Sequence, residues 1–173
     1  MMISADDLNA LVPKRDLTKW VDPLNAAMDE FEINTPEREA AFLAQLAHES
    51  GGFRYVRELA SGEAYEGRAD LGNTQEGDGV RFKGRGLIQI TGRANYAACG
   101  VALGLDLLGH PELLESDENA CRSAAWFWKT HRLNEIADKG DFLLITKRIN
   151  GGTRGYQERI AYWEKAKDAL GVA

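Results

Sequence analysis

Apolar residues recur along this chain mainly at helical spacing, which predicts a mostly α-helical protein. Ser4 and Asp7 form an acidic capping box that opens a short helix through Leu11. The pairs Asp22-Pro23 and Thr35-Pro36 repeat a second start signal, in which an N-cap residue precedes a proline in the first turn. The same periodicity predicts later helices over residues 95–103, 117–131, 141–149 and 157–170.

The helix that begins at Thr35-Pro36 has the clearest apolar face, formed by Phe42, Leu43, Leu46 and Ala47. We expect it to end at Ser50-Gly51-Gly52, since glycine takes the backbone conformation that stops a helix at little cost.

Residues 61–86 follow a different pattern, with little apolar periodicity, many charges and glycines at 62, 67, 72, 77, 79, 84 and 86. A loop of this length inside a compact domain is usually functional. The loop leads into Gly86-Leu87-Ile88-Gln89-Ile90-Thr91-Gly92, whose short alternation predicts a small strand or extended segment.

Composition narrows the class of protein. The chain has 173 residues, 44% of them hydrophobic and 28% charged, with a net charge of -6. We expect one domain over residues 1–173, without a separate binding module. Mixed charges with an acidic balance argue against a nucleic-acid partner. No apolar run is long enough for a transmembrane helix or a signal peptide, so we expect synthesis in the cytoplasm and no stable membrane insertion.

The two cysteines, Cys99 and Cys121, lie in predicted helices, and buried thiols are the expected state, although spacing alone leaves a single disulfide open. Trp126 and Trp128 lie in an apolar helix, and we expect both to pack in the core. The three histidines and two cysteines lack the spacing of metal ligands, so no metal or other cofactor is expected.

Glu49 is the most informative single residue. It follows Leu46 by three positions and Phe42 by seven, so it projects from the apolar face of its helix. It also lies in the last turn, where the helix dipole disfavours a carboxylate. Burial and the dipole both oppose ionisation, and a general acid must hold a proton. We therefore predict that Glu49 is a catalytic acid; the alternative is a glutamate that reaches solvent from a frayed helix end.

Its neighbour His48 is a candidate for contact with substrate, although a lone histidine more often has a packing role. An acid-catalysed hydrolysis, such as that of a glycosidic bond, also needs a second carboxylate, and Glu58, Glu63, Glu66 and Asp70 are all near in sequence. Residue type and position do not choose among these four.

The segment from Phe82 to Tyr96 carries glycines and hydrogen-bonding side chains. Gln89 and Thr91, two apart on an extended segment, are expected to face the same side, with Asn95 and Tyr96 close behind. The segment is either the floor of a carbohydrate cleft or a glycine-rich turn before an amphipathic helix.

Four motifs in order, AHESGGF, FKGRGLIQITGRANY, SAAWFWK and INGG followed by RIAYW, resemble the family 19 glycoside hydrolases. This family includes plant and bacterial chitinases and many phage endolysins. The resemblance covers roughly residues 36–165, and the GRGLIQIT segment with the following NY is its most specific part. It implies a lysozyme-like, two-lobed helical fold with a cleft. The short length is most similar to that of a phage or prophage endolysin.

The resemblance also implies roles for individual residues. Glu49 matches the family's general acid. Glu58, nine residues later, matches the general base of compact members, and Glu63 and Glu66 remain alternatives. Thr91 matches the hydroxyl that holds the attacking water. The remaining matches are sugar-contacting or carboxylate-tuning residues: Gln89, Asn95, Asn150 and Arg159.

These matches imply a monomeric, inverting enzyme that cleaves β-1,4 bonds of peptidoglycan as a muramidase or glucosaminidase, released to the cell wall with the help of a holin. Two alternatives stay open at this point. One is a chitinase of the same fold, and the other is a catalytically inactive sugar-binding module, against which the presence of both Glu49 and Glu58 weighs.

Overall fold

The computed structural model describes residues 2–173, and the mostly helical prediction is confirmed. The helices are α1 (Ala5–Leu11), α2 (Val21–Glu30), α3 (Pro36–Glu49), α4 (Asp78–Arg81), α5 (Arg93–Leu103), α6 (Asp117–Thr130), α7 (Leu133–Asp138), α8 (Phe142–Asn150) and α9 (Tyr156–Leu170). Four 3₁₀ turns cover Thr18–Trp20, Glu63–Tyr65, Ala69–Leu71 and Pro111–Glu115. No helix within residues 2–173 has both the length and the apolar character needed to cross a bilayer.

The predicted helix starts are confirmed where a side chain caps the backbone. Ser4 and Asp7 form the capping box of α1, and Thr35 accepts a hydrogen bond from the Arg38 N–H at the start of α3. The predicted N-cap at Asp22 is wrong: α2 begins at Val21, two residues before Pro23, because it continues directly from the 3₁₀ turn before it.

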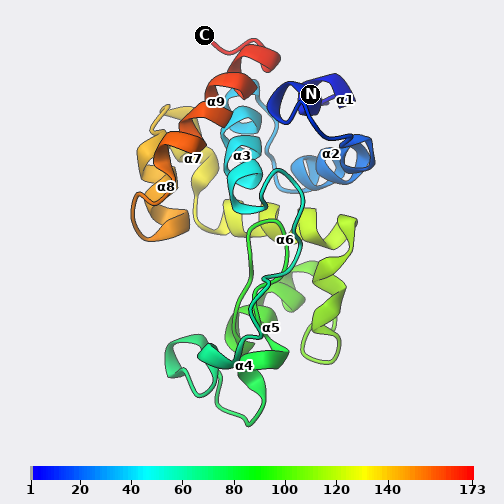
Figure 1. Ribbon diagram of the computed structural model, residues 1–173, viewed down its shortest axis with the longest axis vertical. Coiled ribbons are helices and arrows are strands. Elements are labelled where there is room, and N and C mark those ends of the chain that lie inside the picture. The colour runs from blue at the N-terminus through cyan, green and yellow to red at the C-terminus, as the bar shows by residue number, and fades with distance from the viewer. Residues whose placement is uncertain (1) are drawn as a thin grey trace.

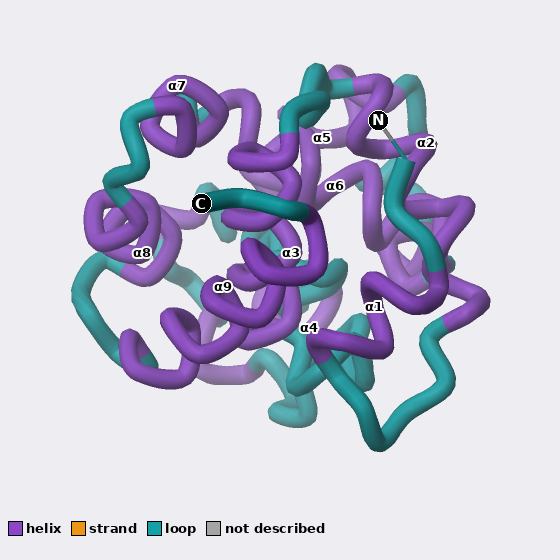
Figure 2. The backbone as a smooth tube through the Cα atoms, turned by 90° about the horizontal axis from the view of Figure 1, so that it is seen from above, coloured by secondary structure: helices purple, strands orange, loops and turns teal. Residues whose placement is uncertain are grey.

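The chain folds into two lobes, as Figure 1 shows. The upper lobe contains α1, α2, α3, α7, α8 and α9, the lower lobe contains α4 and α5, and α6 runs between them (Figure 1). From above, α3 lies near the centre, with α7, α8 and α9 to one side and α1 and α2 to the other (Figure 2). This central position explains why α3 carries apolar residues on almost every side.

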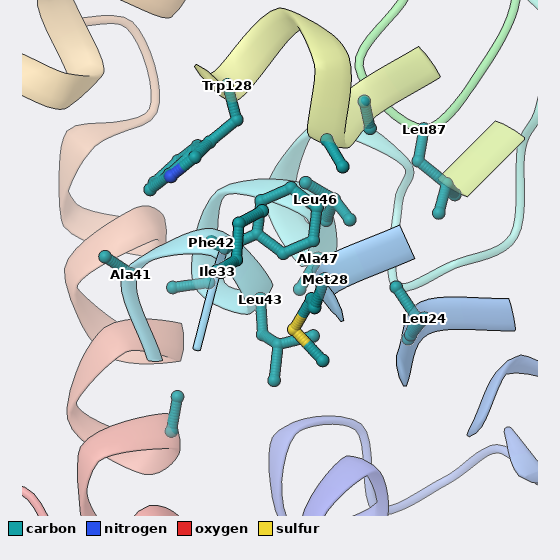
Figure 3. Packing of buried hydrophobic residues seen from close by; sticks show 14 of the residues in the cluster. Leu24, Met28, Ile33, Ala41, Phe42, Leu43, Leu46, Ala47, Leu87 and Trp128 are labelled. Atoms are coloured by element: carbon teal, nitrogen blue, oxygen red, sulfur yellow. The ribbon is translucent and has the colours of Figure 1, made fainter. Parts of the chain in front are cut away.

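The core of the upper lobe forms around α3 (Figure 3). Residues from Ala40 to Ala47 are all buried, and the Phe42 ring meets the Trp128 indole edge-on at 5.3 Å between centroids. Trp128 is wholly buried and donates its Nε1–H to Asn134, so its predicted packing role is confirmed. Burial of this face fixes the direction of α3 and therefore the place of its last residue, Glu49.

The lower lobe has a smaller core of its own, formed by Phe82, Ile90, Tyr96, Cys99, Leu103, Leu107 and Leu114. Cys99 lies here and Cys121 lies in the core of the upper lobe, and both are buried free thiols. Burial raises the pKa of Cys99 to about 12 and raises that of Cys121 further, so both remain protonated.

Polar contacts order the glycine-rich loop. The buried carboxylate of Asp78 accepts from the Arg93 guanidinium at 2.9 Å, and that hydrogen bond lowers the pKa of Asp78. Glu66 accepts from the backbone N–H groups of Gly77 and Gly79 at 2.9 and 2.8 Å. A loop with few apolar residues is thus held by charge-assisted hydrogen bonds.

The extended segment predicted over residues 86–92 is a tight turn instead. Arg85 and Ile90 exchange backbone hydrogen bonds of 3.1 and 2.8 Å, and the residues between them form the turn. Arg85 also forms an isolated bridge with Arg57, and residues 2–173 contain no longer ladder. The turn is favoured because Gly86 adopts a φ of 101°, which residues with a side chain rarely take.

Candidate active site

Glu49 is the last residue of α3, at the end of the helix nearest to α6 and the lower lobe (Figure 1). Its side chain is 24% exposed, so the carboxylate is neither in the core nor free in solvent. One oxygen, Oε1, lies 2.7 Å from Nη2 of Arg159 on α9. A guanidinium at this distance forms an ion pair with the carboxylate and fixes its position. The position of Glu49 within its helix does not reveal this partner, which comes from a helix distant in the sequence.

Arg159 itself is almost wholly buried, with 1% of its surface exposed. Its three guanidinium nitrogens have three different acceptors. Nη2 contacts Glu49, Nη1 donates to Oε1 of Gln45 at 2.6 Å, and Nε donates to the carbonyl of Arg154 at 3.0 Å. We predicted a substrate contact or a tuning role for Arg159. Burial excludes the contact with substrate, since no sugar reaches a side chain that is enclosed on all sides.

His48 points toward α9 rather than into a pocket with Glu49. Its Nδ1 lies 2.8 Å from Oε1 of Glu158, and its side chain is 20% exposed. The ring packs on Gly155, where an added Cβ would come within 2.3 Å of it. These contacts make His48 a link between α3 and α9, and the structure gives no support to its predicted contact with substrate.

Glu58 follows α3 in a segment that pairs with residues 84–86. Its backbone N–H donates to the carbonyl of Gly84 at 2.9 Å, and the Gly84 N–H donates back to Oε1 of its carboxylate at 2.6 Å. Tyr65 donates to the other oxygen at 3.0 Å. Burial and this hydrogen bond raise the pKa of Tyr65, so the phenol keeps its proton and remains a donor. Glu58 is thus held in place through both oxygens.

The other three carboxylates near Glu58 have different surroundings. Glu66 accepts from two backbone N–H groups within its own loop, and Asp70 is paired with Arg68. Glu63 is exposed at the start of a 3₁₀ turn. The structure therefore distinguishes Glu58, the one of these four whose carboxylate accepts from Gly84, next to the turn that carries Gln89.

Gly84 joins Glu58 to that turn. On its other side the Gln89 side chain is so close that an added Cβ would lie 2.6 Å from Oε1 of the amide. Gln89, Thr91 and Asn95 then line one pocket of about 190 Å³, together with Ile90, Trp126, Phe127 and His131. Gln89 and Thr91 do face the same space as predicted, although a tight turn rather than a strand brings them there.

Three residues of this pocket were missed by the sequence analysis: Trp126, Phe127 and His131. Trp126 is half-buried, whereas we expected it to pack fully. Helix geometry predicts this difference. Residues two apart lie on opposite sides of a helix, so Trp126 and Trp128 cannot share one buried face. His131 stacks on Phe127 with ring centroids 3.9 Å apart, which fixes this wall of the pocket.

Tyr96 is not part of the pocket, and its predicted sugar contact is wrong. The side chain is fully buried in the lower core. Its hydroxyl donates to the carbonyl of Lys83 and accepts from Nη1 of Arg85 at 3.1 Å. Burial strongly raises its pKa. Tyr96 instead supports the segment 83–85 from beneath, and so supports Gly84 and the carboxylate of Glu58.

Asn150 is exposed at the C-terminal end of α8, before the loop that carries Arg154 to α9. Asn95 donates to the carbonyl of Thr91 at 2.8 Å, which fixes its side chain beside the pocket. The structure thus brings most predicted residues into two groups. One group, at the end of α3, consists of Glu49 and Arg159. The other lies around the turn and its flanking residues, 84–91, and consists of Glu58, Gln89, Thr91 and Asn95.

Comparison with known proteins places this arrangement in a family. The model of the family described as "Chitinase class I" matches residues 25–139. A glycosyl hydrolase family 19 domain-containing protein of Haemophilus influenzae is 33% identical over 192 aligned positions, with 92% of each chain covered. An Arabidopsis thaliana endochitinase is 36% identical over 84% of this chain, which spans 53% of the length of that relative.

The likeness extends to the fold. The crystal structure of chitinase C from Streptomyces griseus superposes with a TM-score of 0.82 and 26% identity, covering 99% of this chain and 93% of that one. The family match includes α3 with Glu49, the segment of Glu58, and the 84–91 turn. With these comparisons, the chain belongs to the family 19 glycoside hydrolases and is a glycosidase.

Proposed function

We propose that this protein is an endolysin-type enzyme that cleaves β-1,4 bonds of peptidoglycan glycan strands during bacterial lysis. The catalytic part of the proposal rests on one observation: two carboxylates from separate segments are each fixed by hydrogen-bond donors of the protein. Glu49 is held by Arg159, and Glu58 by Gly84 and Tyr65. Two fixed carboxyl groups are the basic requirement for glycoside hydrolysis.

In the proposed mechanism, Glu49 protonates the leaving oxygen of the glycosidic bond. Glu58 takes a proton from a water molecule, which attacks the opposite face of the sugar and inverts its configuration. Thr91, which lines the pocket next to Gln89, holds that water through its hydroxyl. An inverting enzyme keeps its carboxyl groups roughly 6.5–9.5 Å apart to leave room for the water.

The choice of an anionic polymer as substrate is supported by Arg148. Its Nη1 donates to the carbonyl of His131, at the wall of the pocket, at 3.0 Å. Arg148 is exposed, and its guanidinium takes part in none of the ion pairs found within residues 2–173. Peptidoglycan carries carboxylates on its peptide stems whereas chitin is uncharged, so a cation without a carboxylate partner at this place favours peptidoglycan.

Chitin is the second candidate substrate, favoured by the comparisons, since the Streptomyces griseus and Arabidopsis thaliana proteins are named as chitinases. Both polymers share β-1,4 links and N-acetyl groups, which Gln89 and Asn95 can bind in either case. We further propose synthesis in the host cytoplasm, action as a monomer, and release to the cell wall through a holin.

The catalytic assignment is tested with Glu49→Gln and Glu58→Gln in a clearing assay on permeabilised Gram-negative cells, run beside chitin oligomers. Each variant should lose at least about a hundredfold in rate, since general acid–base catalysis contributes that much. Glu63→Gln is the matched control, because it alters an exposed glutamate of the same loop. A Glu49→Gln variant that clears cells at the parent rate refutes the assignment.

The substrate is tested by mass spectrometry of released muropeptides, which shows the bond that is cut. Cleavage of chitin alone makes the protein a chitinase, and sugar affinity without cleavage of either polymer makes it a binding module. Arg148→Gln should slow the reaction on cell walls and leave chitin oligomers unaffected. It should also weaken the dependence of the cell-wall reaction on salt.

A further inference from the structure

A chain of buried hydrogen bonds runs from α8 through α3 to the candidate acid. Gln45 on α3 and Thr146 on α8 are both 0% exposed, in a region that is otherwise apolar. Nε2 of Gln45 donates to Oγ1 of Thr146 at 3.0 Å, and Oε1 of Gln45 accepts from Arg159 at 2.6 Å. Arg159 in turn contacts Glu49 at 2.7 Å. Four side chains from three helices thus form one connected path.

The path has a single direction of hydrogen bonding. The Thr146 hydroxyl donates to the carbonyl of Phe142 at 3.0 Å, and a carbonyl oxygen only accepts. The hydroxyl proton of Thr146 is therefore used in the hydrogen bond to Phe142, and toward Gln45 the hydroxyl oxygen can only accept. The Gln45 amide must then turn its NH₂ group toward Thr146, which leaves its oxygen for Arg159. Through this order, one backbone carbonyl of α8 determines how the carboxamide next to Arg159 is oriented.

The orientation of Gln45 matters because a guanidinium is a planar fork with fixed donor directions. Gln45 and the Arg154 carbonyl hold two of its nitrogens, so the third is aimed at Glu49. Without the amide oxygen of Gln45, the Arg159 guanidinium could rotate about its remaining contacts. Glu49 would then lose a donor of fixed direction. Burial strengthens the effect, since no water can replace the missing acceptor.

We propose that Gln45 and Thr146 are positioning residues of the glycosidase, which set the direction of the Arg159 guanidinium toward Glu49. Neither residue is exposed, so neither touches substrate. The inference rests on the role of Glu49 as general acid proposed above. It adds that α8, which contributes no predicted catalytic group, controls the geometry of the acid through Thr146.

The test compares Thr146→Val with Thr146→Ser in the full-length protein. Valine has nearly the same shape as threonine but can neither donate nor accept, so it breaks the path, whereas serine restores it. Thr146→Val should lower kcat roughly tenfold, because a small misplacement of a catalytic group has a large effect on rate. KM should change less than about twofold, since substrate contacts are intact. Thr146→Ser should keep kcat near the parent value.

The pH–rate profile separates positioning from general loss of packing. In Thr146→Val the pH–rate profile should differ from that of the parent, because the surroundings of the catalytic carboxyl group change. Ile145→Val is the matched control. It trims a buried residue next to Thr146 and lowers stability without touching the hydrogen-bond path, so its pH profile should match the parent.

Two results would overturn the proposal. The first is a folded Thr146→Val variant with parent kcat and pH profile, and the second is a Thr146→Ser variant as impaired as Thr146→Val. Failure of the proposed function has a different signature, in which Glu49→Gln itself remains active. With Glu49→Gln inactive and Thr146→Val fully active, the catalytic assignment stands and the positioning role alone is refuted.

Discussion

The buried guanidinium of Arg159 lies 2.7 Å from the carboxylate of Glu49, across the contact between α9 and α3. This pair changes the chemistry expected of Glu49. The guanidinium gives the carboxylate at the end of α3 a partner whose donor direction is fixed by its own buried contacts.

Replacing Arg159 with lysine tests how much of this effect needs the planar fork. An ammonium group keeps the charge but cannot reach Glu49, Gln45 and the Arg154 carbonyl together. We expect Arg159→Lys to lose about 1–3 kcal/mol of unfolding free energy, the usual result of leaving a buried polar group without a partner. Urea denaturation measures this loss. Arg159→Met, which removes the charge, should lose more, about 3–5 kcal/mol. Equal urea midpoints for Arg159→Lys and the parent would contradict the prediction that these contacts need a planar guanidinium.

Gly84 should be sensitive to the smallest possible side chain. An added Cβ would lie 2.6 Å from Oε1 and 3.1 Å from Cβ of Gln89, so Gly84→Ala must displace that side chain from the pocket. We expect kcat/KM to fall by about tenfold, with stability little changed, because the reactive groups are misplaced while the core is intact. The measurement is steady-state kinetics combined with thermal melting.

A double-mutant cycle decides whether Gly84 acts through Gln89. If it does, Gly84→Ala combined with Gln89→Ala should be no slower than Gln89→Ala alone. Additive losses would show that the methyl group disturbs something else, the Glu58 carboxylate being the nearest candidate.

Glu39 should make the protein less stable as the pH rises. It is fully buried in α3, neither carboxylate oxygen has a hydrogen-bond partner within residues 2–173, and desolvation raises its pKa from 4.5 to about 7. The folded state therefore binds the proton more tightly than the unfolded state does. Stability is unaffected below the unfolded pKa and falls as the pH rises through the window between the two values. The full loss is about 3 kcal/mol, reached above the folded pKa.

Glu39→Gln removes this titration, so its stability relative to the parent should improve between pH 5 and pH 8. Urea denaturation at the two pH values measures the difference. Glu37→Gln is the control, since Glu37 is exposed in the first turn of the same helix and should show almost no such change. A Glu39→Gln effect of the same size at both pH values would mean that the carboxyl group does not titrate in this window.

Gly155 should be needed for its lack of a side chain as well as for its backbone conformation. It adopts a φ of 69° before α9, and an added Cβ would lie 2.3 Å from Cε1 of His48. Gly171 is a matched control at the other end of α9, with a φ of 73° and no atom within 4 Å of the added position. Gly171→Ala should lose about 1–2 kcal/mol through backbone strain alone.

Gly155→Ala should lose about 1–3 kcal/mol more than Gly171→Ala, because the His48 ring must move away from Glu158. Thermal melting of the two variants gives the difference directly. Equal losses would show that His48 moves freely, in which case its contact with α9 does not hold the last turn of α3.

Much of the helical framework followed from local signals. The caps at Ser4 and Thr35, and the end of α3 at Ser50, depend on residues three or four positions apart, so they are visible without the fold. The short helix α7 escaped prediction. It has six residues, too few for a periodic pattern. It begins after Arg132, which adopts a φ of 58°, a conformation that cannot be predicted from an arginine.

The candidate site was predictable in type but not in arrangement. Glu49 stood out because its position conflicts with the helix dipole and the apolar face, and the resemblance to a family selected Glu58. Tyr96 shows the limit of such matching. Its motif suggested contact with a sugar, yet packing placed it in the lower core with its hydroxyl bonded to Lys83 and Arg85.

By itself the sequence determined which segments become helices, where most of them start, and which residue types are available for acid–base chemistry. These depend on hydrogen bonds and side-chain spacing within one or two turns. Only the tertiary structure decided which side chains meet. Gln45 and Arg159 are 114 residues apart, and Gln45 and Thr146 are 101 apart. Their contacts depend on how the apolar faces of three helices pack, because that packing sets the distance and rotation of each helix relative to the others.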